Sequence, residues 1–194
     1  MAIYSLYEPL LKAAEGGFQK IPSDSGNYNS LRQLVGTNRG ISAKRWEEEI
    51  NRPPTENDMR SITKDQAKEF FKVHYWDVCK ADKIFDQYVA NTIVDMHVNA
   101  WNGAELAQKV LNQYFGKDLV IDNKIGKNTL NALNSVNARA FVDIFNQERV
   151  KYYKEENNPE WLPIWLNRVK DFGYQNAKLF WASMFVIGFF LPIY

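Results

Sequence analysis

The stretch AAEGGFQKIPSDSGNYNS, residues 13–30, decides how the whole sequence is interpreted. It is preceded by apolar residues at i, i+3, i+4 and i+7 spacing: Ile3, Leu6, Tyr7, Leu10, Leu11 and Ala14. That spacing predicts an amphipathic helix. Gly16 and Gly17 end the helix, because glycine readily adopts the left-handed conformation of helix C-termini. The helix therefore stops on Glu15, and Asp24 follows nine positions later. The stretch is either an ordinary surface turn or an active site.

Composition and charge exclude several functions. The chain has 24 basic and 23 acidic residues, so its net charge of +1 gives no general attraction to nucleic acid. The single Cys79 cannot form an intrachain disulfide, and no CxxC or His/Cys cluster has metal-ligand spacing. We therefore expect no nucleic-acid partner, no redox chemistry and no structural zinc.

The two ends of the chain differ in character. The first fifteen residues lack the basic and apolar regions of a secretory signal, which predicts synthesis in the cytoplasm and action after release. Residues 179–194, LFWASMFVIGFFLPIY, carry no charge. As a helix they would span about 24 Å, short of the ~30 Å hydrocarbon core of a bilayer. This tail either contacts a membrane or is buried against the protein or a partner.

Helix patterns dominate the rest of the sequence and predict a mainly α fold. Residues 18–60 are rich in Gly, Asn, Ser and Pro and are predicted to be largely irregular, with one short helix opened by Ser42. Thr63 and Gln66 form a capping-box pattern for the next helix. Further helix patterns cover residues 84–98, 104–115, 138–153 and 161–169, and DLVIDNKIGKNTLNAL (118–133) predicts a loop followed by a helix. Strand patterns are few.

Glu15 and Asp24 are the residues of the opening stretch that carry chemistry. The negative end of a helix dipole and an apolar cleft both disfavour an ionised glutamate, so Glu15 would be able to donate a proton. Cleavage of a glycosidic bond needs such a donor and a second group, here Asp24, that orients water or stabilises the sugar cation. The residues alone leave the other interpretation open, in which Glu15 is a solvated glutamate and Asp24 a turn residue. His74 and His97 lie among apolar neighbours and indicate packing rather than catalysis.

The order of motifs along the chain resembles glycoside hydrolase family 108. EGGF (15–18), PSDSG (22–26) and GTNRGIS (36–42) are similar to the EGGY, P-x-D-x-G and T-N-x-G-I motifs of that family. HYWD (74–77) and DMHVN (95–99) resemble its YW motif and its D-x-x-x-N helix. Beyond them, DNKIGKNTLNAL (122–133), ERVKYY (148–153) and WLNRV (165–169) resemble the predicted peptidoglycan-binding domain that usually follows. The resemblance covers about residues 3–173.

This resemblance implies a fold, a division of the chain and an activity. The fold would be lysozyme-like and helical, with an appended helical peptidoglycan-binding-like module. Residues 1–95 would be catalytic, residues 96–173 would form the module packed on them, and residues 174–194 the apolar tail. The activity would be that of a phage or prophage endolysin, an N-acetylmuramidase that cleaves the β-1,4 bond between N-acetylmuramic acid and N-acetylglucosamine in peptidoglycan strands. It needs no metal or organic cofactor. The oligomeric state is left open.

The same resemblance assigns roles to individual residues. Glu15 becomes the general acid, while Asp24 and Thr37 hold the attacking water. The residues expected to contact the glycan are Phe18, Asn38, Trp76, Asp95 and Asn99. For the last three, support of the catalytic helix is an alternative, because side chains at i and i+4 share a helix face.

The sequence departs from the family pattern at three places. An insertion, NYNSLRQLV (27–35), places Thr37 thirteen positions after Asp24, and Ser30 lies closer and is a rival for the hydroxyl role. Phe18 replaces the usual tyrosine. Asn123 replaces a glycine, which is tolerated because asparagine also adopts positive φ. Two other functions stay open: a non-catalytic cell-wall binding or secretion-assisting protein, and a membrane-tethered lytic factor of a secretion or transfer apparatus.

Overall fold

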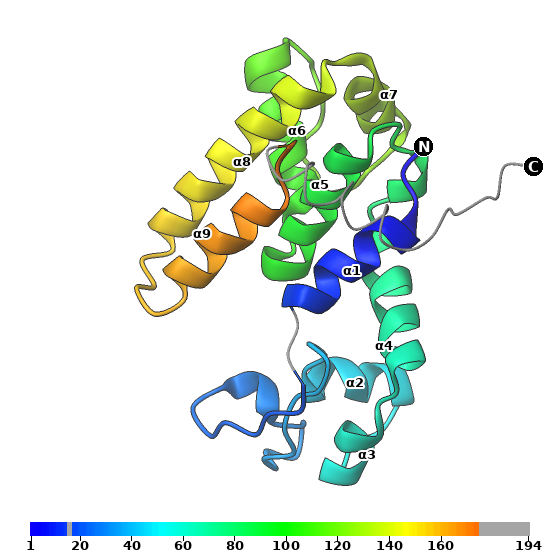
Figure 1. Cartoon of the computed structure of the whole chain (residues 1–194), viewed down its shortest axis with the longest axis vertical. Coiled ribbons are helices and arrows are strands. Elements are labelled where there is room, and N and C mark those ends of the chain that lie inside the picture. Colours follow the sequence, from blue (N-terminus) through cyan, green and yellow to red (C-terminus); the bar gives the residue numbers. More distant parts are fainter. Residues whose placement is uncertain (15–16, 175–194) are drawn as a thin grey trace, which may run out of the picture. The chain divides into compact units, whose positions relative to one another are not determined.

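The computed structural model describes residues 1–14 and 17–174, so Glu15, Gly16 and the apolar tail lie outside the described residues. The chain divides into two units, which are considered separately. The N-terminal unit is residues 4–74, and the C-terminal unit is residues 1–3 together with the chain from Tyr75 onward. The prediction of a mainly α fold is confirmed: Figure 1 shows helices joined by loops, and β pairing in the described part of the chain is limited to isolated bridges.

The N-terminal unit contains the helices α1 (Tyr4–Ala14), α2 (Ala43–Ile50), α3 (Glu56–Ser61) and α4 (Lys64–Phe71). Pro9 lies inside α1. Two contacts fasten α1 to α4: the Tyr4 hydroxyl donates to the Lys68 carbonyl at 2.8 Å, and Lys68 Nζ lies 3.0 Å from Glu8 Oε2. They fix how α1 packs on α4.

Local capping signals in the N-terminal unit were predicted correctly. Ser42 caps α2 by accepting from the Arg45 amide, and Thr63 and Gln66 form the capping box that begins α4. The prediction that residues 18–60 are irregular apart from one short helix was wrong at α3. A second capping box, formed by Thr55 and Asp58, begins that helix.

Isolated antiparallel bridges hold the chain between α1 and α2. They pair Gln19 with Thr37, Tyr28 with Leu34, and Asn38 with Ile41. A short 3-10 turn, η1 (Ser25–Asn27), lies within this segment, and Asp24 is its N-cap. The segment that carries the predicted motifs is therefore an ordered loop fixed by paired backbone.

The C-terminal unit is built on α5 (Gln87–Ala100), α6 (Gly103–Phe115), α7 (Lys127–Ser135), α8 (Ala138–Glu155) and α9 (Leu162–Asp171). The turns η2 (Lys72–Trp76) and η3 (Ala81–Lys83) precede them along the chain. As Figure 1 shows, α5 packs on α6 and α8, and α8 also packs on α6 and α9. Their core includes the buried side chains of Ile93, Val94, Ala107, Leu111, Phe141 and Phe145.

Gly103 explains how α6 begins so close to α5. A Cβ atom at this position would lie 2.3 Å from the Ile93 carbonyl oxygen and 2.9 Å from the His97 amide nitrogen. Any side chain would therefore collide with the backbone of α5. A glycine at the start of α6 permits the tight corner between the two helices.

The division of the chain predicted from the motifs places a boundary between residues 95 and 96, which lies inside α5. The assignment of a catalytic role to residues 1–95 and of a binding role to residues 96–173 stays a prediction. In the described part of the chain, no helix is both long enough and apolar enough to cross a membrane. The tail at residues 179–194, for which membrane contact was considered, lies outside that part.

Candidate active site

Glu15, the predicted general acid, follows directly on the last residue of α1 and lies outside the described residues. The chain is described again from Gly17. The candidate site is therefore built from the loop that follows, residues 17–41, and from the elements that fix this loop.

Thr37 is paired with Gln19, near the beginning of the loop. The Gln19 amide donates to the Thr37 carbonyl at 2.9 Å, and the Thr37 amide donates to the Gln19 carbonyl at 2.8 Å. Gly36 makes this pairing possible. It has a φ of +92°, and a Cβ there would lie 2.7 Å from the Gln19 carbonyl oxygen and 2.7 Å from the Phe18 ring. The glycine of the GTNRGIS motif thus lets Thr37 lie beside Gln19.

Asp24 has a carboxylate held by the loop itself. Its Oδ1 accepts from the Gly26 amide at 2.8 Å, and its Oδ2 accepts from Asn27 Nδ2 at 2.6 Å. A Cβ at Gly26 would lie 3.1 Å from Oδ1, so a side chain at this position would crowd the Asp24 carboxylate. A carboxylate has about four lone-pair sites. Both oxygens therefore keep capacity to accept from a water molecule.

The two rival hydroxyl groups differ in their surroundings. Thr37 is 7% exposed, and its hydroxyl makes no hydrogen bond with any residue that the structure describes. Ser30 is exposed, its hydroxyl donates to Glu47 Oε1, and its amide donates to Glu47 Oε2 at 2.9 Å. Among the described residues, only the Ser30 hydroxyl of the two rivals is therefore engaged by a side chain, that of Glu47.

Phe18 and Asn38, predicted to contact the glycan, fasten the loop to α3. The guanidinium carbon of Arg60 lies 3.7 Å from the centroid of the half-buried Phe18 ring. Asn38 is buried, and its Nδ2 donates to the Met59 carbonyl at 2.8 Å. A contact of either residue with substrate stays a prediction.

Trp76, Asp95 and Asn99 belong to the C-terminal unit. Asp95 is 0% exposed and accepts from Arg149 Nη2 at 2.6 Å and from Arg168 Nε at 2.8 Å. Asn99 Nδ2 lies 3.5 Å from the Tyr153 hydroxyl, and Trp76 is buried. These contacts agree with the alternative in which the three residues support the structure. A contact with the glycan stays a prediction.

The buried cluster around Asp95 joins three helices, α5, α8 and α9. Burial by itself lowers the pKa of Arg149, but attraction to Asp95 and contact with Tyr153 outweigh it, so the pKa is raised and the guanidinium stays charged. Thr92 accepts from Arg149 Nη1 at 3.1 Å. The predicted D-x-x-x-N motif therefore supplies an ion pair inside the C-terminal unit.

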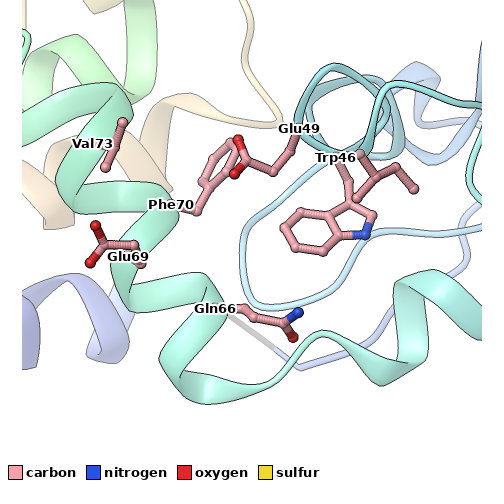
Figure 2. A pocket seen from close by; sticks show the side chains of 7 residues that line it. Trp46, Glu49, Gln66, Glu69, Phe70 and Val73 are labelled. Atoms are coloured by element: carbon pink, nitrogen blue, oxygen red, sulfur yellow. The ribbon is translucent and has the colours of Figure 1, made fainter.

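A pocket of about 290 Å³ lies between α2 and α4 (Figure 2). Its lining residues are Trp46, Glu49, Ile50, Gln66, Glu69, Phe70 and Val73, and none of them is a predicted site residue. Trp46 and Phe70 are almost fully buried and offer little ring surface to a ligand. Glu49, one of the lining residues, is paired with His74, with its Oε2 2.8 Å from His74 Nε2. This pocket is therefore not assigned to the candidate active site.

Two other side chains that could carry chemistry, Cys79 and His97, are buried. Burial raises the pKa of Cys79 to about 12, so this thiol stays protonated. Burial lowers the pKa of His97, which packs against both Tyr75 and Trp101. Within the described ranges, no group of three or more His, Cys, Asp or Glu side chains could hold a metal ion.

Two residues of the site, Asn27 and Arg60, were not predicted from the sequence. Asn27 opens the insertion, which was considered only for its effect on spacing. Its position directly after the PSDSG turn was a signal, because asparagine side chains often bond the backbone of turns. Arg60 gave no signal, since its contact with Phe18 joins residues that are distant in sequence.

Comparisons with known proteins give one family match, which covers part of the chain. Residues 9–100 match the family described as Glycosyl hydrolase 108. Every predicted site residue, from Glu15 to Asn99, falls within this range. The match supports a glycoside hydrolase, and with it a glycan substrate.

The chain is similar in fold to SagA from Brucella abortus. The TM-score is 0.68 and the sequence identity 19%, over 90% of this chain and 97% of that chain. At this identity the likeness shows a shared fold. No curated protein matches the chain.

Proposed function

We propose that this protein is a peptidoglycan hydrolase of the family 108 type, an N-acetylmuramidase that cleaves the β-1,4 bond between N-acetylmuramic acid and N-acetylglucosamine. One observation carries the proposal. The family match spans all three proposed catalytic residues, and the ordered loop that follows α1 contains two of them, Asp24 and Thr37. The third, Glu15, lies at the end of α1 in sequence.

In the proposed reaction, Glu15 donates its proton to the glycosidic oxygen, so the bond from this oxygen to the anomeric carbon breaks. Asp24 and Thr37 hold a water molecule that attacks the anomeric carbon, and Asp24 takes up the proton that the water loses. The spare lone pairs of Asp24 and the unbonded hydroxyl of Thr37 support this role. Ser30 is disfavoured because its hydroxyl is bonded to Glu47.

We further propose that residues 96–173 help to hold the peptidoglycan strand. The motif at residues 122–133 forms a compact loop and α7 around the buried Gln108, whose Nε2 donates to Asp122 Oδ1 at 2.8 Å. Asn123 has a φ of +58°, a conformation that asparagine tolerates, which supports the resemblance of this loop to the glycine-containing motif. Synthesis in the cytoplasm followed by release onto the wall, as for an endolysin, completes the proposal.

The bond that is cleaved can be tested directly. Purified peptidoglycan is digested with the protein, the new reducing ends are reduced with borohydride, and the products are analysed by mass spectrometry. N-acetylmuraminitol at the new ends is the expected result. N-acetylglucosaminitol would contradict the specificity, and a complete lack of new reducing ends would contradict glycosidase activity.

The stereochemistry of the first product tests the role of Asp24. Direct attack by a held water inverts the anomeric centre, so early NMR spectra of the product should show the α anomer. A β anomer as first product would indicate a covalent intermediate on the enzyme, and the water-holding role would be wrong.

A further inference from the structure

Asn27, the first residue of the insertion, is completely buried although it lies in a loop. Its side chain makes two hydrogen bonds with opposite roles. Nδ2 donates to Asp24 Oδ2 at 2.6 Å, and Oδ1 accepts from the Ile21 amide at 3.1 Å. Because the two ends of the amide are used in this way, the side chain has one orientation in which both bonds form.

The backbone of Asn27 extends the connection toward Thr37. The Asn27 carbonyl accepts from the Val35 amide at 2.9 Å and from the Gly36 amide at 3.0 Å. Gly36 directly precedes Thr37. One buried residue therefore links the carboxylate of Asp24 to the backbone next to Thr37, through bonds that all lie within the loop.

We propose that Asn27 is a positioning residue, which holds the Asp24 carboxylate and the Thr37 backbone at a fixed separation for the attacking water. The inference rests on the proposed function, in which these two residues bind that water. A hydrogen bond to an ionised carboxylate is among the stronger ones in proteins, and small displacements of a catalytic group are costly. The insertion thus supplies a part of the site instead of interrupting it.

Asn29 offers a matched control in the same insertion. It is also buried, and its side chain makes a comparable set of bonds: Nδ2 donates to Gln33 Oε1 at 2.9 Å and to the Pro54 carbonyl at 3.0 Å, and Oδ1 accepts from the Gln33 amide at 2.9 Å. None of these bonds involves Asp24. Replacing Asn29 removes a buried anchor of the loop and leaves the contact with the carboxylate in place.

The first test compares kcat and apparent KM of the wild type, Asn27→Ala and Asn29→Ala on solubilised glycan strands, below the unfolding temperature of each. Loss of the bond to Asp24 should lower kcat of Asn27→Ala by roughly 10- to 100-fold with little change in KM. Asn29→Ala should keep kcat within about 3-fold even where it is less stable. Equal losses of kcat in both variants would overturn the inference.

A double-mutant cycle with Asp24→Ala separates this inference from the proposed function. If Asn27 acts through Asp24, then Asn27→Ala should cost nothing more once Asp24 is alanine. A further loss of about 10-fold in the double variant would show that Asn27 acts independently of Asp24 and would overturn the inference. Wild-type activity of Asp24→Ala itself would instead overturn the role of Asp24 in the proposed function.

Asn27→Asp keeps the inference testable if Asn27→Ala does not fold. This variant retains an acceptor for the Ile21 amide but places a carboxylate, in place of a donor, against Asp24. We expect the same loss of kcat as in Asn27→Ala. An unchanged kcat in Asn27→Asp would overturn the inference.

Discussion

Thr37 and Ser30 are distinguished by what their hydroxyl groups contact. The Thr37 hydroxyl has no partner among the described residues, while that of Ser30 is bonded to Glu47. Thr37→Val keeps the shape of the side chain and removes the hydroxyl, so kcat should fall by roughly 10-fold or more. Ser30→Ala should keep nearly full activity. The reverse pattern, measured by release of reducing ends, would assign the hydroxyl role to Ser30.

Individual residues were predicted well where their roles are local. Ser42 and Thr63 cap helices through amides three positions away, and the positive φ of Asn123 is a property of that residue alone; the structure shows all three. Asn27 and Arg60 act through contacts that depend on how the loop closes. No sequence pattern predicts the contact between Arg60 and Phe18. Only the folded structure of the loop shows it.

At the scale of elements, a cluster of charges fastens the loop to α3. Arg60 stacks on Phe18 and also bonds Glu56 Oε1 at 2.7 Å, and Glu56 Oε2 lies 2.6 Å from Lys20 Nζ. The segment 18–20 begins three positions after Glu15. This segment of the candidate site is therefore attached to α3 by a cation–π contact and an ion pair.

Arg60→Ala should lower activity by roughly 2- to 5-fold, because it removes the cation–π contact that fixes Phe18. Arg52→Ala is the matched control. Arg52 also pairs with a carboxylate of α3: its Nη1 and Nη2 each lie 2.8 Å from an oxygen of Asp58. This pair does not involve Phe18. Rates of reducing-end release from the two variants test this difference. Equal rates would show that the stack on Phe18 does not matter for catalysis.

Most helices were predicted from apolar spacing, because a helix that packs on the core carries apolar residues along one face. The exception, α3, has six residues and buries only Met59 among them. So short a helix gives little periodic signal, and its capping box was the remaining clue. The pairing of Gln19 with Thr37 could not be predicted, since a single bridge has no alternating pattern.

At the scale of the whole molecule, the buried cluster around Asp95 joins three helices of the C-terminal unit. Asp95→Asn leaves the buried Arg149 without its counter-charge, so the free energy of unfolding should fall by about 3–5 kcal/mol. Urea unfolding measures this loss. Glu105→Gln, which removes an exposed pair with Lys109 on α6, should have an effect close to zero. A similarly small effect of Asp95→Asn would contradict the supporting role.

His97 should make the protein sensitive to acid. Burial lowers its pKa in the folded state below the value of about 6.5 expected for the unfolded chain. As the pH falls below about 6.5, His97 binds a proton in the unfolded chain before it does so in the folded protein. The free energy of unfolding, which is highest above this pH, therefore declines. His97→Gln should flatten the decline in urea unfolding measured from pH 7.5 to 5.5. An unchanged slope would assign the sensitivity to other groups.

The central claim is that the Glu15 carboxyl group donates the proton that breaks the glycosidic bond. The most direct measurement compares the release of reducing ends from purified peptidoglycan by the wild type, Glu15→Gln and Glu8→Gln. Glu8 lies on the same helix and pairs with Lys68, so its replacement controls for a change of charge on α1. We predict that Glu15→Gln loses activity while remaining folded and that Glu8→Gln retains it. Wild-type rates in Glu15→Gln would contradict the account.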